Sequence, residues 1–114
     1  MTRVRDQLLA NLQREWQRKP FDATAVLRRL EELLAWLVRP ENDTDTNCKS
    51  VDLFVCTKLR IPPGLPDDLH DLLFDVGGSL HDTHSSPEVA RNFESTPEEL
   101  LRGTREMLNR RGNP

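Results

Sequence analysis

The sequence predicts an all-α domain, and three observations lead to that fold class. Apolar residues recur at intervals of three and four along most of the chain, which is the spacing of one helical face. Prolines followed by acidic residues mark three helix starts. No second convincing strand exists with which a lone strand could pair. With 114 residues the chain fits a single domain, so we expect a small orthogonal bundle of five to six short helices over residues 1–114, with the last few residues disordered.

The first two predicted helices have the clearest apolar spacing. The first covers residues 4–16 and places five apolar side chains on one face: Val4, Leu8, Leu9, Leu12 and Trp16. The second follows Asp22, a good N-cap, and Phe21 can pack on Val26 as a hydrophobic staple. We expect this helix to end near Arg39.

Residues 48–59 fit two structures after a polar loop at residues 41–47. Their apolar residues alternate as in a strand, yet Val51, Phe54, Val55 and Leu59 also fit one helical face. A lone strand would leave its backbone groups without hydrogen-bond partners, so helix is the prediction.

The fourth helix begins near Pro66, and acidic residues in its first turn suit the positive end of the helix dipole. Its buried face consists of Leu69, Leu72, Leu73, Val76 and Leu80. Gly77 and Gly78 lie inside this pattern, where each costs about 1 kcal/mol relative to alanine. We therefore expect a neighbouring helix to approach the backbone there, or a local kink.

Two further helix starts close the chain. Ser86-Pro87 is expected to open a short helix that ends near Phe93, and Thr96-Pro97-Glu98-Glu99 is a capping box that opens the last helix. The core predicted from all these patterns includes Leu30, Leu34, Leu69, Leu73, Leu80 and Leu101.

The cysteines and the lengths of the apolar runs indicate in which cellular compartment the protein is expected to act. No run of about 18 apolar residues is present, and the first 16 residues lack the apolar stretch of a secretion signal. Cys48 and Cys56 would be about 12 Å apart on a helix, too far for a disulfide, so we expect free thiols that fill the core. The prediction is a cytoplasmic protein without a membrane segment.

Charge is divided unevenly along the chain. Residues 40–99 contain four Lys/Arg and thirteen Asp/Glu, a balance of −9, whereas the segments on either side are each at +3. Such a segment is either ordinary solvated surface or a surface that attracts a basic partner. The candidate partner-binding residues are Glu41, Asp43, Asp45, Asp67, Asp68, Asp71, Asp75 and Asp82. A net −9 also disfavours nucleic acid at the middle of the chain, since phosphates would be repelled.

Catalytic and metal-binding patterns are weak. His81 and His84 have the i, i+3 spacing of some metal pairs, but His70 is too distant to join them, so no metal and no cofactor is expected. Ser86 beside His84 is better explained as a helix cap than as a nucleophile. We expect neither an enzyme nor a small-molecule substrate.

The stretch LHDTHSSPEVARNFESTPEELL at residues 80–101, with DDLHDLLFDVGGS before it, resembles the immunity proteins of bacterial contact-dependent growth inhibition systems. The likeness covers roughly residues 48–108. It implies a protein that binds and neutralises the toxin domain of its own system in the cytoplasm, and such toxins are often nucleases with basic clefts. Toxin-contacting positions vary in such systems, so the resemblance assigns no binding residue.

Two other functions remain open on the sequence alone. One is a DNA-binding regulator or antitoxin that uses the arginine-rich helices at residues 3–19 or 102–111. The other is a structural adaptor that pairs through exposed Trp16 or Trp36.

Overall fold

The computed structural model describes residues 2–59, 65–82 and 96–112, and every regular element in that part of the chain is an α-helix. The predicted all-α fold class is therefore confirmed. The helices are α1 (Thr2–Gln17), α2 (Ala23–Leu37), α3 (Asp45–Lys58), α4 (Asp67–Asp82) and α6 (Pro97–Gly112). The short helix predicted from Ser86 to Phe93 lies outside the described residues.

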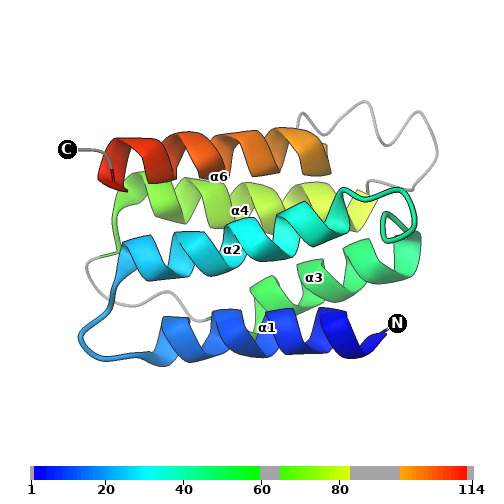
Figure 1. Ribbon diagram of the computed structural model, residues 1–114, viewed down its shortest axis with the longest axis horizontal. Helices are drawn as coiled ribbons and strands as arrows, with labels where there is room; N and C mark the ends of the chain where they lie inside the picture. Colours follow the sequence, from blue (N-terminus) through cyan, green and yellow to red (C-terminus); the bar gives the residue numbers. More distant parts are fainter. Residues whose placement is uncertain (1, 60–64, 83–95, 113–114) are drawn as a thin grey trace.

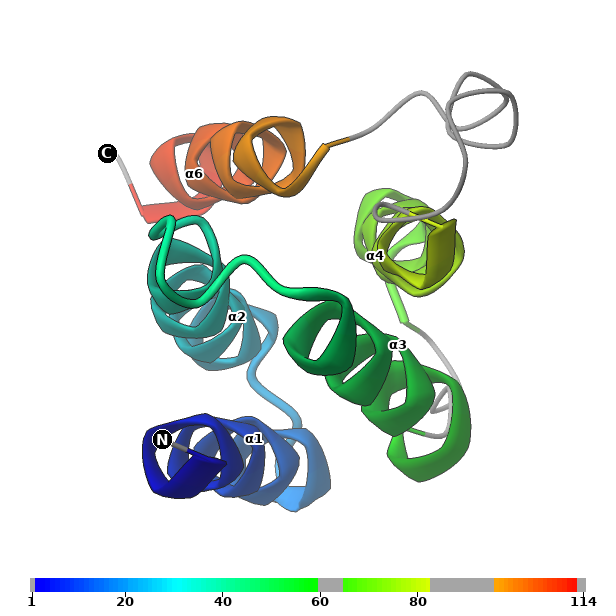
Figure 2. The ribbon, with the colours of Figure 1, turned by 90° about the vertical axis from the view of Figure 1, so that its right-hand side faces the viewer.

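Successive helices run up and down along the long axis of a molecule that measures 40 × 29 × 25 Å. In Figure 1, α1, α3 and α6 run in one direction and α2 and α4 in the other. Figure 2 views the bundle end-on, with α2 between α1 and α6, and α4 beside α3. The arrangement therefore differs from the orthogonal one predicted. Helices of 14 to 16 residues bury their apolar faces over a greater length when neighbouring helices lie side by side than when they cross at right angles.

Side-chain caps set the starts of two helices as predicted. Asp22 accepts hydrogen bonds from the backbone N–H groups of Thr24 and Ala25, at 3.0 and 3.2 Å. The hydroxyl of Thr96 accepts one from the N–H of Glu99 at 3.2 Å, and its side chain also bonds the Glu99 carboxylate. These bonds satisfy N–H groups that have no partner within the helix.

The third helix confirms the helical choice for residues 48–59 and also extends it. It begins at Asp45, because Thr44 is an N-cap whose hydroxyl accepts a hydrogen bond from the N–H of Asn47 at 3.2 Å. The predicted loop at residues 41–47 is therefore shorter than expected.

The core draws on all five helices, and the six leucines predicted for it are all buried. Two predictions about α1 need correction. Val4 is 50% exposed, because the buried stripe of this helix starts one turn later at Leu8. Trp16 is buried with its ring edge-on to Phe21, 5.5 Å between centroids, and Trp36 is half-buried against the core. Pairing through an exposed Trp16 is thus excluded.

Candidate partner-binding surface

The acidic residues singled out in the sequence form two groups rather than one surface. Glu41, Asp43 and Asp45 lie where the chain passes from α2 to α3, at the end of the bundle where α4 finishes. The second group begins with Asp67 and Asp68 at the start of α4, which lies at the opposite end (Figure 1). A helix of 16 residues is about 24 Å long, so about the length of α4 separates Asp67 and Asp68 from the first group, whereas Asp82 ends α4 at the same end as that group.

Within the first group, two carboxylates already have partners. Asp45 pairs with Lys49 one turn along α3, with 3.2 Å between Oδ2 and Nζ. Asp43 accepts a hydrogen bond from the thiol of Cys48 at 3.6 Å. Glu41 is exposed and forms no ion pair with any residue that the structure describes. In this group Lys49 therefore offsets the charge of Asp45, whereas the Cys48 thiol that donates to Asp43 is neutral.

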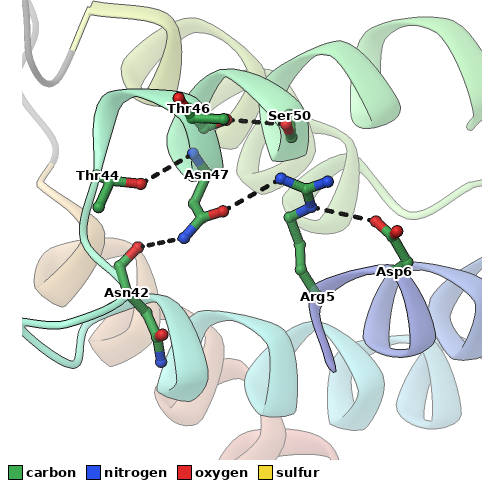
Figure 3. A network of polar contacts seen from close by, with 7 residues as sticks. All are labelled: Arg5, Asp6, Asn42, Thr44, Thr46, Asn47 and Ser50. Carbon is green, nitrogen blue, oxygen red and sulfur yellow. Dashed lines mark hydrogen bonds and ion pairs between the residues drawn. The ribbon is translucent and has the colours of Figure 1, made fainter. Parts of the chain in front are cut away.

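A polar network fixes the segment that carries these carboxylates (Figure 3). The side-chain amide of Asn47 donates to the carbonyl of Asn42 at 2.9 Å and its oxygen accepts from Nη1 of Arg5 at 3.2 Å. Arg5 belongs to α1, and its Nε also contacts Asp6 at 3.2 Å. The network joins α1 to the start of α3, and we assign it a structural role.

The second group lies on α4 and is the more exposed one. Asp67, Asp71 and Asp75 are spaced four residues apart, so they follow one face of the helix. The Asp71 side chain is 84% exposed, and its Oδ1 lies 3.7 Å from Nδ1 of the neighbouring His70, which is charged only when protonated. Asp67 is exposed, Asp75 is half-buried, and Asp68 pairs with Arg111 of α6 at 2.8 Å. Asp82 is the last residue of α4, and its side chain lies outside the described part.

An exposed aromatic ring interrupts this acidic face. Phe74 is 78% exposed and follows Asp71 by three residues, which places the two side chains on adjacent turns. Phe74 is not among the contact residues predicted from the sequence, although it falls outside the predicted buried face of α4. Aromatic side chains are enriched at protein–protein contact surfaces, so Phe74 is a candidate contact residue.

An apolar groove of about 350 Å³ lies beside Phe74, between α3 and α4. The α3 side contributes Val55, Cys56 and Leu59, the α4 side contributes His70, Leu73, Phe74 and Gly77, and Leu65 precedes α4. Gly77 supports the predicted close approach at the glycine pair, since a Cβ there would be 3.1 Å from Sγ of Cys56.

The two cysteines are free thiols, as predicted, but they differ in environment. Cys48 is buried, and burial, the charge of Asp43 and the hydrogen bond to Asp43 raise the pKa of its thiol to about 12. Cys56 is exposed, so its predicted role as a core filler is wrong: its side chain faces the groove. Partial burial and the nearby Asp52 raise the pKa of the Cys56 thiol.

The other chemistry considered from the sequence finds no site in the described residues. No group of three or more His, Cys, Asp or Glu side chains among them could hold a metal ion. The side chains of His81, His84 and Ser86 lie outside that part of the chain. Of the helices searched, none has the length and apolar character needed to cross a membrane.

The arginines of α6, one of the two helices named for the DNA-binding alternative, partly form ion pairs with other helices. Arg105 pairs with Glu31 of α2 at 3.2 Å, and Arg111 pairs with Asp68 of α4. Arg102 and Arg110 are exposed. Two of the four arginines in this helix therefore join the bundle together.

Comparison with known proteins adds no relative: the chain matches no family model, no curated protein and no solved structure.

Proposed function

We propose that this chain is an immunity protein, which binds and neutralises the toxin domain of a contact-dependent growth inhibition system in the cytoplasm of the producing cell. The toxin domain would present a basic surface, as a nuclease cleft does, and inhibition would be stoichiometric. Two things support the proposal: the resemblance of residues 80–101 to this family, and the acidic outer face of α4.

One observation carries the proposal, namely the spacing and exposure of carboxylates on α4. Asp67 and Asp71 are exposed one turn apart, and Asp75 follows one turn later. Like charges at i, i+4 destabilise a helix by about 0.2–0.5 kcal/mol per pair. A basic partner would remove that repulsion and gain attraction, so the arrangement favours binding of a cationic surface.

Opposite charge would act mainly on the rate of association. Long-range attraction brings the partners together faster at low salt, and the Debye length falls from about 10 Å at 0.1 M to about 3 Å at 1 M. We therefore expect association with the toxin domain to slow as salt rises, and dissociation to change less.

The test is charge reversal on α4 with a matched control elsewhere. In the double variant Asp67→Lys with Asp71→Lys, the ion pair of Asp68 stays intact. The control is Glu98→Lys with Glu106→Lys, two exposed carboxylates of α6 that give the same change in net charge, and Glu98, like Asp67, lies in the first turn of its helix. Each protein is produced in cells together with the toxin domain encoded beside its gene, and growth is measured.

The α4 variant should lose protection and associate at least tenfold more slowly with the purified toxin domain, while the control protects. Circular dichroism of both variants verifies that the bundle stays folded. Full protection by the α4 variant would remove the acidic-face mechanism. Failure of the wild-type protein to bind the toxin domain, together with a salt-sensitive gel shift on duplex DNA, would replace the proposal by a DNA-binding regulator.

A further inference from the structure

We infer that the groove between α3 and α4 receives an apolar side chain from a basic segment of the partner protein, with Phe74 as the contact at its rim. The inference rests on the proposed function, because it names the part of the toxin domain that this surface would recognise. An apolar anchor in the groove would add affinity for the partner to that supplied by charge attraction alone.

The shape of the groove fits a side chain rather than a large ligand. Its volume of about 350 Å³ is at the lower end of the range for ligand pockets. Leu73 and Gly77 of α4 and Val55 of α3 contribute to its apolar lining. Because Gly77 has no side chain, α3 and α4 approach closely there. An inserted side chain would leave water for an apolar lining, and this is how anchor residues gain affinity.

Phe74 gives the groove an exposed apolar edge. It lines the groove and is also 78% exposed, so a partner seated there would cover a large apolar area that now contacts water. Leu53, the other strongly exposed large residue of this pair of helices, is 62% exposed but does not line the groove. The apolar contact is therefore expected to centre on Phe74.

The charged residues around the groove indicate which kind of partner segment it would bind. Asp71 is three residues from Phe74, and Asp67 is three residues from His70, so both carboxylates flank the α4 side. Asp52 lies behind Gly77, with Oδ1 3.7 Å from the position of a Cβ. Lys58, exposed at the end of α3, is a cation on the other side. Acidic groups predominate, so lysines or arginines beside the inserted side chain would be attracted.

A second copy of this chain fits less well. It would bring the same exposed carboxylates of α4 toward a surface that already has an excess of them, and like-charge juxtaposition disfavours association. The occupant is therefore a basic partner segment, and self-association is an outcome that the experiment must detect.

The first experiment measures affinity of the toxin domain for Phe74→Ala and for Leu53→Ala. Both changes remove an exposed apolar side chain, and only Phe74 borders the groove. Phe74→Ala should raise the Kd about 30-fold or more, as expected for an anchor residue, whereas Leu53→Ala should change it less than about threefold. If the wild type binds and Phe74→Ala binds equally well, the groove inference is wrong while the immunity proposal stands.

The second experiment requires no toxin. Cys56 lines the groove and is exposed, so its rate of alkylation by iodoacetamide at about pH 9 reports on access, with buried Cys48 as internal reference. The probes are synthetic pentapeptides with a central phenylalanine flanked by lysines, the same peptide with central alanine, and one with glutamates in place of lysines.

The lysine–phenylalanine peptide should slow alkylation of Cys56 saturably, at least threefold, and the other two should not. Equal protection by the glutamate peptide, or none by any peptide, would overturn the inference. If alkylation of Cys56 slows as the protein concentration rises in the absence of any peptide, a second copy of the chain fills the groove. If the toxin domain does not bind but the lysine–phenylalanine peptide protects Cys56, the immunity proposal fails and the groove inference survives.

Discussion

Gly77 of α4 lies directly against Cys56 of α3, so that a Cβ on the glycine would be 3.1 Å from the cysteine Sγ. This distance is shorter than most contacts of a Cβ atom, and it sets how closely α3 and α4 approach beside the groove. A glycine within a helix costs about 1 kcal/mol relative to alanine, and the close approach gives that cost a structural reason.

The effect of replacing Gly77 on the free energy of unfolding should therefore depend on the side chain at position 56. In the wild type, Gly77→Ala gains helix propensity but must displace the Cys56 thiol, whereas in a Cys56→Ala background the gain should be realised in full, up to about 1 kcal/mol. Urea unfolding of the four proteins measures the coupling. If Gly77→Ala has the same effect in both backgrounds, the contact does not limit the packing of α3 against α4.

Loss of the cap on α6 should destabilise the whole protein. Thr96→Ala removes the acceptor for the N–H of Glu99 and should lower the free energy of unfolding by about 1 kcal/mol. Thr57→Ala is the control, since the Thr57 hydroxyl donates to Leu53 O within its own helix and caps nothing. A urea midpoint for Thr96→Ala equal to that of Thr57→Ala would mean that the cap contributes nothing to stability.

Alkaline pH should weaken the fold through Cys48. Because its pKa rises from about 9 to about 12 on folding, the folded state favours the neutral thiol. That stability is complete below pH 9 and is lost as pH rises from 9 toward 12, with a slope of up to about 1.4 kcal/mol per pH unit.

Urea unfolding at several values from pH 8 to about 10.5 should therefore show a shallower loss for Cys48→Ala than for the wild type. Val51→Ala is the control, because it removes a buried side chain from the same helix and leaves the thiol in place. Its slope should match that of the wild type even though its stability is lower. Equal slopes for all three proteins would contradict the raised pKa of Cys48.

Because of the network in Figure 3, Arg5 should contribute more to the stability of the fold than the nearby Arg3 does. The Arg5 side chain is 14% exposed and bonds Asn47, so Arg5→Ala should cost about 1 kcal/mol by removing this link between α1 and α3. Arg3→Ala changes an exposed arginine and should stay within about 0.5 kcal/mol of the wild type. Thermal unfolding of both proteins compares them, and an Arg3→Ala effect as large as that of Arg5→Ala would argue against the network.

The sequence predicted those parts of the fold that depend on neighbouring residues. Asp22 and Thr96 cap helices by contacts within three residues, and the burial of Leu30 or Leu69 follows from spacing along one helix. The start of α3 was missed because Thr44 lies in a polar run with several possible caps. The side-by-side, mostly antiparallel packing of the helices was also missed, since spacing within a helix does not fix how helices cross.

The candidate surface was harder to predict because it depends on which helices become neighbours. The acidic residues look like one segment in the sequence, but α4 begins at the end of the bundle opposite to residues 41–45, so Asp67 and Asp68 lie far from them. Cys56 was predicted to fill the core as a small apolar side chain, yet its thiol faces a groove that exists only once α3 and α4 are packed. Arg111 could be recognised as the partner of Asp68 only from the structure.

Along α4, the residues that anchor the helix and those that face outwards alternate within the same turns. Leu69 and Val76 are buried, whereas Asp71 and Phe74 are exposed, so substitutions in the second set disturb no core contact. Leu73 differs, because it belongs to both the core and the groove. In descendants of this chain, the charge and contacts of the outer surface are free to diverge as a partner changes, while the shape of the groove is inherited together with the core.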